Sequence, residues 1–162
     1  MPPLDPTIAY RRALGAFATG VCVVTADSAE GPLGLTVNSF TSVSLTPPLI
    51  LWCLEETSAR WPAFATAERF AVHVLGAEQA ALAERFATGI CRLESDELEP
   101  RVDGEPPLMP GALTRLICTT TERTQAGDHL IVLGRVDRWE TRPGDGLVFY
   151  KGWYSKVEGQ GR

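Results

Sequence analysis

The sequence lacks several features that would assign the protein to a class at once. No apolar run approaches the roughly 20 residues that a membrane-spanning helix needs, so we expect no contact with a membrane. The N-terminus, MPPLDPTIAYRR, has neither the basic start nor the apolar stretch of a secretory signal peptide. Internal repeats, low-complexity tracts and linkers are missing too. We therefore expect a cytoplasmic protein with a single domain over residues 1–162.

Features of metal-binding and nucleic-acid-binding proteins are also scarce. The chain has 4 cysteines and 2 histidines, and no two cysteines form a C-x-x-C pair. This pattern predicts reduced thiols and no metal site. The net charge of −5 disfavours binding to nucleic acid or to an anionic membrane, although it leaves room for a local basic pocket.

Short β-branched and apolar runs dominate what is present, and turn residues separate them. Such runs predict strands joined by turns, with few regular crossover helices. The expected strands are 21–27, 34–45, 49–54, 69–75, 113–123, 129–139 and 147–157, with a hairpin turn at 125–128. We expect a mainly β protein, a closed or nearly closed antiparallel barrel with a few flanking α-helices.

Three helices and one long excursion complete the expected layout. A helix begins at Asp5-Pro6, carries an apolar stripe of Tyr10, Leu14 and Phe17, and ends at Gly20. Ser58 can cap a short second helix, and residues 77–87 are nearly all strong helix formers. Residues 89–110 are rich in acids, Pro and Gly, so we interpret them as a surface excursion that could act as a lid.

The most informative stretch runs from Thr36 to Ser44, TVNSFTSVS, where hydroxyl and amide side chains alternate with apolar ones. Buried hydroxyls without partners cost roughly 1–3 kcal/mol each, so a core strand would not use so many. One interpretation is a solvated edge strand. The other is the wall of a pocket for a polar, planar ligand that forms hydrogen bonds.

From the residues alone, the two histidines and one phenylalanine are predicted to have structural roles. His129 follows Gly127-Asp128 and would ordinarily be a turn or strand-start residue. His73 alternates with valines and is predicted to be structural. Phe86 lies on the apolar stripe of the helix at 77–87 and is predicted to be in the core.

Long matching stretches resemble the flavin reductase-like family, the small reductase partners of two-component flavin monooxygenases. The similarity covers nearly the whole chain, and its most specific motif is T-x-N-S-F-x-S-V-S-x-x-P-P with a later G-D-H. The stretches that carry it are 17–25, 34–49, 70–75, 127–129 and 152–154. The resemblance implies an FMN-binding split β-barrel, antiparallel and Greek-key-like, and a homodimer with flavin near the subunit interface.

The resemblance also implies roles for individual residues. Contacts to the isoalloxazine and ribityl groups are implied for Thr36, Val37, Asn38, Ser39, Ser42, Val43 and Ser44. Ser58 matches a serine on the flavin phosphate, and Arg60 replaces a common threonine there, where its guanidinium could still hold a phosphate. From the residues alone, Ser58 is equally a helix cap and Arg60 a solvated side chain. His129 is implied to bind NADH or NADPH, with Asp128 orienting it and Tyr154 close by.

The implied activity is hydride transfer from NADH or NADPH to FMN or FAD, and the reduced, diffusible flavin then serves a partner monooxygenase. This chemistry belongs to the two cofactors, so it requires no nucleophile and no strong base. One alternative is an enzyme of the same fold that keeps its flavin and acts on an organic substrate. Others are a flavin-binding or haem-binding module without catalysis, in which His73 or His129 would be the haem ligand, and a carrier of apolar ligands.

Overall fold

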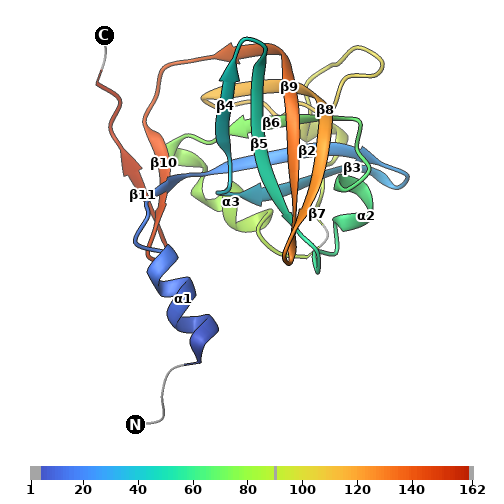
Figure 1. Cartoon of the computed structure of the whole chain (residues 1–162). Helices are drawn as coiled ribbons and strands as arrows, with labels where there is room; N and C mark the ends of the chain where they lie inside the picture. Colours follow the sequence, from blue (N-terminus) through green and yellow to red (C-terminus); the bar gives the residue numbers. More distant parts are fainter. Residues whose placement is uncertain (1–4, 90, 161–162) are drawn as a thin grey trace.

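Antiparallel strands make up most of the protein (Figure 1), and the computed structural model describes residues 5–89 and 91–160. The strands are β1 Thr19–Gly20, β2 Cys22–Ser28, β3 Gly31–Val37, β4 Thr41–Leu45, β5 Pro48–Glu55, β6 Arg69–Val74, β7 Cys91–Arg92, β8 Thr114–Ala126, β9 His129–Thr141, β10 Gly146–Tyr150 and β11 Trp153–Val157. The helices are α1 Pro6–Leu14, α2 Trp61–Phe64 and α3 Ala80–Arg85, with 3-10 turns at Ala77–Gln79 and Ser95–Glu97. Residues 1–4, which begin the segment used to argue against a signal peptide, lie outside the described residues.

One large sheet bends round on itself, and its strand order is β4-β5-β9-β8-β6-β2-β3-β7. Among the described residues its two edge strands, β4 and β7, do not pair with each other, so the barrel is split rather than closed. A smaller sheet with the order β1-β10-β11 stands beside it (Figure 1). The mainly β, split-barrel prediction is therefore confirmed. No helix in the described ranges is long and apolar enough to span a membrane.

The interior of the large sheet is filled by aromatic and branched side chains. The ring of Trp52 lies 5.8 Å from those of Phe64 and Phe70 in edge-on geometries, which aromatic pairs favour. Alternate residues of β5, including Trp52 and Leu54, are buried because the pleat turns them to one face. The sheet is thus a rigid scaffold for the loops at its ends.

Three predicted elements are divided or begin differently in the structure. The single strand expected over 34–45 is two strands, β3 and β4, because the chain turns at residues 38–40. The strand expected over 147–157 is the hairpin β10–β11, with a turn at Lys151 and Gly152, which both have positive φ. The helix expected over 77–87 begins as a 3-10 turn and becomes α3 only at Ala80.

Residues 89–110 do not form a free lid, although residue 90 lies outside the described residues. Leu93, Leu108 and Met109 from this segment are buried. Thr25 Oγ1 donates to Pro107 O at 2.5 Å, and Arg101 pairs with the carboxylate of Asp27. The segment is therefore anchored to the sheet by these buried residues, while residues 94–96 and 100–104 stay on the surface, as expected of a surface excursion.

Helix α1 projects from the body of the protein (Figure 1). It begins at Pro6 as predicted, with Asp5 accepting from Thr7 N at 2.7 Å, but it ends at Leu14, before the expected Gly20. Its apolar side chains stay exposed in the protomer, at 65% for Tyr10 and 56% for Leu14. The predicted stripe therefore exists but has no partner among the described residues.

Candidate functional site

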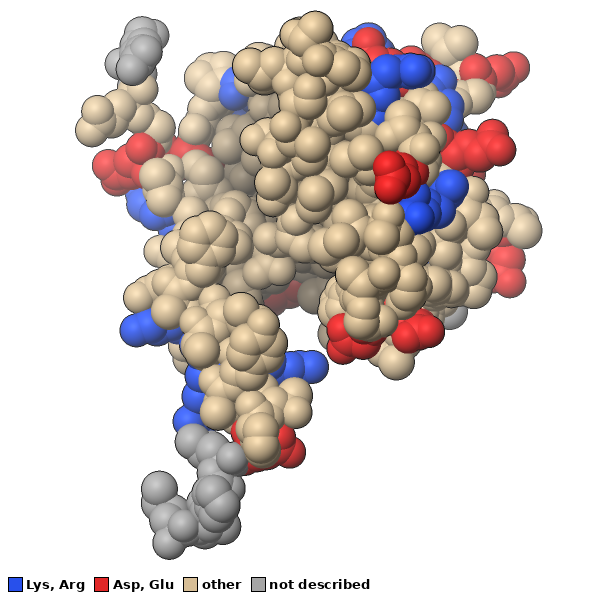
Figure 2. Space-filling view, in the orientation of Figure 1, with Lys and Arg blue, Asp and Glu red and all other residues tan. Residues whose placement is uncertain are grey.

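A large cavity lies between the C-terminal end of α1 and the loop that connects β3 to β4. Its volume of about 1080 Å³ is slightly above the usual range of cofactor sites, about 300–1,000 Å³, so a flavin has room in it. Its lining consists of Arg11, residues 13–15 and 17–20, Cys22, residues 38–41, Val74 and Phe149. In the space-filling view α1 stands apart from the body, and the surface over β4 and β5 carries few charges (Figure 2).

A smaller pocket of about 130 Å³ adjoins this cavity, because both share Asn38 and Phe149. Its other walls are Val21, Thr36, Val37 and Tyr154. The Tyr154 ring packs on Phe149 at 5.4 Å, and burial, followed by the nearby Glu84, raises the pKa of the Tyr154 hydroxyl. Asn38, Ser39, Thr36, Val37 and Tyr154, all predicted contact residues, are thus gathered in one region.

Two of the hydroxyls in this region are already used by the protein itself. Thr36 Oγ1 donates to Ala83 O of α3 at 2.7 Å. Ser39 Oγ accepts from Cys53 N at 2.9 Å and so anchors the β3–β4 loop to β5. The hydroxyl stretch is therefore partly structural, and the exposed amide of Asn38 and nearby backbone groups remain for a ligand.

Ser42, Val43 and Ser44 lie on β4, an edge strand of the large sheet. The register with β5 shifts between Ser42 and Ser44, which leaves Val43 as a bulge. Ser42 and Val43 are exposed and Ser44 is half-buried, and none of the three lines either cavity. This half of the stretch matches the edge-strand interpretation, and its role in flavin binding stays a prediction.

Ser58 and Arg60 lie in the turn after β5 but differ in exposure. Ser58 Oγ accepts from Arg60 N at 3.2 Å, so it caps the turn locally rather than the helix itself. Arg60 is only 4% exposed, and burial lowers the pKa of its guanidinium. The interpretation of Arg60 as a solvated side chain is wrong, because its guanidinium donates to backbone carbonyls inside the protein.

Asp128 and His129 form the end of the β8–β9 hairpin, as the turn residues predict. The His129 ring donates from Nδ1 to Asp128 Oδ1 at 2.8 Å, and this hydrogen bond is the main cause of the lowered pKa of Asp128. Glu56 N donates to Asp128 O at 2.9 Å, which ties the hairpin to the end of β5. Neither residue lines the cavity. Arg11, which does line it, also contributes through its charge to the lowered pKa of Asp128.

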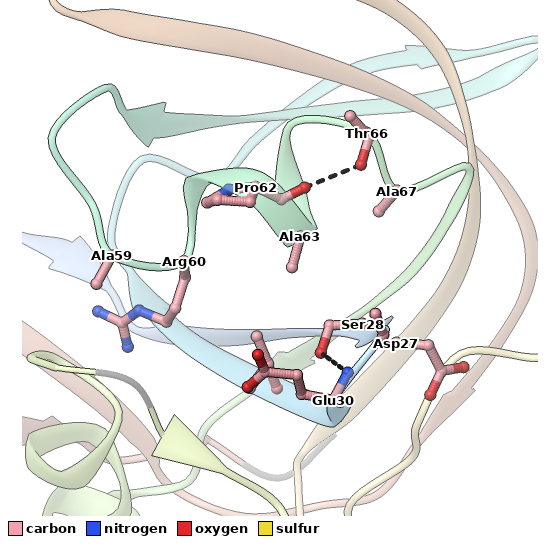
Figure 3. A pocket seen from close by; sticks show the side chains of 11 residues that line it. Asp27, Ser28, Glu30, Ala59, Arg60, Pro62, Ala63, Thr66 and Ala67 are labelled. Atoms are coloured by element: carbon pink, nitrogen blue, oxygen red, sulfur yellow. Dashed lines mark hydrogen bonds between the residues drawn. The ribbon is translucent and has the colours of Figure 1, made fainter.

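A second pocket, of about 520 Å³, lies between α2 and the β2–β3 hairpin (Figure 3). Its polar groups are bonded within the protein: Thr66 Oγ1 donates to Pro62 O at 2.9 Å, and Ser28 Oγ accepts from Glu30 N at 3.2 Å. The carboxylates of Asp27 and Glu30 also line it, and each is paired with an arginine, while the guanidinium of Arg60 in the lining donates to backbone carbonyls. The cavity at Asn38 is therefore the better cofactor site.

Sequence reasoning assigned no role to several residues that line the main cavity. They are Arg11, the loop residues Gly15 and Phe17–Gly20, and Phe149. The small residues of this loop leave room for a ligand, and Arg11 is the charged side chain in the lining. The stretch FATGVCVVT, which carries part of the family resemblance, includes residues 17–20 and was the signal that could have identified these four.

Comparison with known proteins identifies the class. The model of the flavin reductase like domain matches residues 14–158, so the chain belongs to this family. The FMN reductase (NADH) SmoA of Agrobacterium fabrum is 46% identical over 99% of this chain and 91% of its own length. The structure of the NADH:FAD oxidoreductase SgcE6 of Streptomyces globisporus, in complex with NAD and FAD fragments, has a TM-score of 0.86 at 34% identity, covering 97% of both chains.

Some relatives are longer than this protein. A probable flavin reductase of Rhizobium meliloti is 41% identical over 93% of this chain, but the match spans 48% of that protein. The family resemblance inferred from the T-x-N-S-F-x-S-V-S motif is confirmed by these matches.

Proposed function

We propose that this protein is an NADH- or NADPH-dependent flavin reductase that delivers reduced FMN or FAD to a partner monooxygenase. The observation that carries the proposal is the cavity at Asn38 in a chain of the flavin reductase like domain family. SmoA and SgcE6 support it, because their names describe reduction of FMN or FAD with NADH.

The cavity fits a flavin in size and in chemistry. Its lining is mostly apolar or small, from Leu14 and Phe17 to Gly20, as the flat faces of an isoalloxazine require. The Asn38 amide and the turn at residues 38–40 offer hydrogen-bonding groups to the ring edge. Arg11 supplies a positive charge at the same wall, which suits a phosphate or a reduced dinucleotide.

A bound flavin supplies the hydride acceptor, so the protein needs to bind the flavin, orient it and exclude water. In the proposed assignment Thr36, Val37, Asn38 and Ser39 hold the ring, with Ser42, Val43 and Ser44 completing the contact from β4. Ser58 contacts the phosphate. His129, oriented by Asp128, and Tyr154 bind the nicotinamide side.

We further propose that two copies form a homodimer, which is supported by the unpaired apolar surface. Tyr10, Leu14 and Phe17 are 65%, 56% and 78% exposed, and Leu45 on β4 is 92% exposed. Exposed apolar groups of this size mark interaction surfaces. A second copy that covers α1 would also close the open side of the cavity. A single domain over residues 1–162 and a cytoplasmic location complete the proposal.

The test is the near-ultraviolet absorbance of NADH or NADPH followed with and without added FMN or FAD. Oxidation that depends on added flavin is the expected result. Tightly bound flavin after purification, with no turnover of added flavin, would instead indicate an enzyme that acts on an organic substrate. A Soret band would indicate a haem-binding module. A protein that binds neither flavin at micromolar levels would overturn the proposal.

A further inference from the structure

We infer that Arg60 is a positioning residue for the flavin: it locks the end of α3 to β3 and thereby fixes the strand end that carries Thr36 and Asn38. This inference rests on the proposed function, because flavin binding defines the role. It assigns Arg60 an indirect part in place of a direct contact with the phosphate.

The guanidinium of Arg60 joins three backbone carbonyls from two elements. Its Nη1 donates to Phe86 O at 2.6 Å and to Gly34 O at 3.2 Å, and its Nη2 donates to Ala87 O at 3.4 Å. The last carbonyls of a helix have no partners within the helix, and a cation is favourable at that end. Arg60 therefore caps the C-terminal end of α3 and fastens it to β3 at the same time.

The outer edge of β3 depends on α3 for its hydrogen bonds. Among the described residues, β7 pairs with Leu33 and Gly34 of β3. Beyond that point Thr36 N donates to Phe86 O at 2.9 Å, and Thr36 Oγ1 donates to Ala83 O at 2.7 Å. The end of α3 thus replaces a strand, and Phe86 O accepts from both Thr36 and Arg60.

The contact between α3 and β3 is closely packed. A Cβ at Gly34 would lie 2.7 Å from Cδ1 of Phe86, so this close approach requires glycine. Phe86 is fully buried, and it cannot move outward without opening a gap in the core. A shift of the carbonyl at Phe86 would therefore move Thr36, and the strand end after it.

The direction of the Arg60 side chain also disfavours contact with a phosphate in the neighbouring pocket. Its guanidinium is turned away from Thr66 and Ala67 (Figure 3). Arg60 lines this pocket together with Asp27 and Glu30, but its Nη1 and Nη2 already donate to backbone carbonyls. The threonine that is common here in the resembling family is too short to span from the turn at Ser58 to three carbonyls, so this chain uses a different support.

The experiment compares two flavins, FMN and riboflavin, which lacks the phosphate. We expect Arg60→Met to weaken the binding of both by the same factor, about tenfold. The reason is that the strand end that carries Thr36 and Asn38 would shift, and both flavins share the ring that it holds. Arg60→Lys should recover part of the affinity, since an ammonium can still donate to Phe86 O. Ser58→Ala should weaken FMN only. At saturating flavin, the KM for NADH in the Arg60 variants should change by a smaller factor than the flavin dissociation constants.

Arg115→Met is the matched control. Arg115 is also partly buried and donates to a backbone carbonyl, Met109 O, and to two carboxylates, but it has no contact with α3 or β3. We expect this variant to lose stability and to keep both flavin affinities. If Arg60→Met does not fold, Arg60→Lys alone tests the inference. We then expect Arg60→Lys to weaken the binding of FMN and of riboflavin by the same, smaller factor.

Two results with the variants would overturn the inference. A loss of FMN binding with riboflavin binding unchanged would make Arg60 a phosphate contact. Unchanged binding of both flavins by folded variants would make it a structural residue with no bearing on the site. A wild-type protein that binds neither flavin would overturn the proposed function as well, and this failure is seen before any variant is made.

Discussion

Met109 donates a backbone hydrogen bond of 3.0 Å to Nε2 of His73. The other ring nitrogen, Nδ1, lies 3.1 Å from Val23 O, and a carbonyl can only accept, so Nδ1 carries the proton and Nε2 has none. His73 is fully buried, and this burial, which outweighs the hydrogen bond to Val23, lowers its pKa to about 4. The neutral ring joins the segment 89–110 to the sheet, as expected of a structural histidine.

We predict that the protein loses stability as the pH falls below 6.5. The unfolded chain takes up a proton at His73 near 6.5, whereas the folded chain does so only near 4. Between these values the unfolded state binds more protons, so the free energy of unfolding falls by about 1 kcal/mol per pH unit. Above 6.5 the contribution is constant. Urea denaturation at several pH values measures the slope.

The variant His73→Gln separates this effect from other titrations. It removes the buried ring, so its pH slope between 6.5 and 4 should be shallower than that of the wild type by the amount given above. An unchanged slope in His73→Gln would contradict the prediction.

Patterns within single elements were readable from the sequence, but long-range contacts were not. The hairpin at Gly127 and the start of α1 at Asp5-Pro6 follow from local turn and cap chemistry. The division of residues 147–157 into two strands was missed because the turn needs a positive φ at Lys151, and a lysine does not signal that conformation in a sequence. The segment 89–110 has no periodicity, so its packing through Leu108 and Met109 could not be anticipated.

Gly134 provides a second test of the core. A Cβ at this position of β9 would lie 2.5 Å from Cζ of the buried Phe70 ring. We predict that Gly134→Ala lowers the free energy of unfolding by about 1–3 kcal/mol, the usual cost of overpacking. Gly20→Ala is the control, since no atom lies within 4 Å of the added methyl. Equal stability of the two variants in urea denaturation would show that the core yields at Phe70.

The candidate site could be predicted only in part. Thr36, Asn38 and Tyr154 were identified from the motifs, and they do meet at one cavity. The internal use of the Thr36 and Ser39 hydroxyls depends on partners in α3 and β5, which are distant in sequence. Arg60 was interpreted as solvated or phosphate-bound because nothing near it in the sequence indicates the carbonyls that bury it.

The proposed homodimer predicts an effect of a charge on α1. We expect Leu14→Glu to convert the dimer to a monomer, because the new carboxylate would have to be desolvated in an apolar interface. Arg12→Glu changes charge on the same helix without removing apolar surface, so it should stay dimeric. Sedimentation equilibrium distinguishes the two states. A wild-type protein that is monomeric at micromolar concentration would contradict the assignment of the exposed stripe.

His129 gives the sharpest test of the assignment on the nicotinamide side. We predict that His129→Ala lowers kcat/KM for NADH by about tenfold, equivalent to about 1.4 kcal/mol of lost binding, while the flavin dissociation constant changes little. The reason is that the imidazole is held by Asp128 at the hairpin end, away from the residues of β3 that we propose to bind the flavin. Asp128→Asn keeps a hydrogen-bond acceptor for the ring, so it should lose less activity than His129→Ala. Equal losses of flavin affinity and NADH use in His129→Ala, measured by titration and steady-state kinetics, would remove His129 from the nicotinamide site.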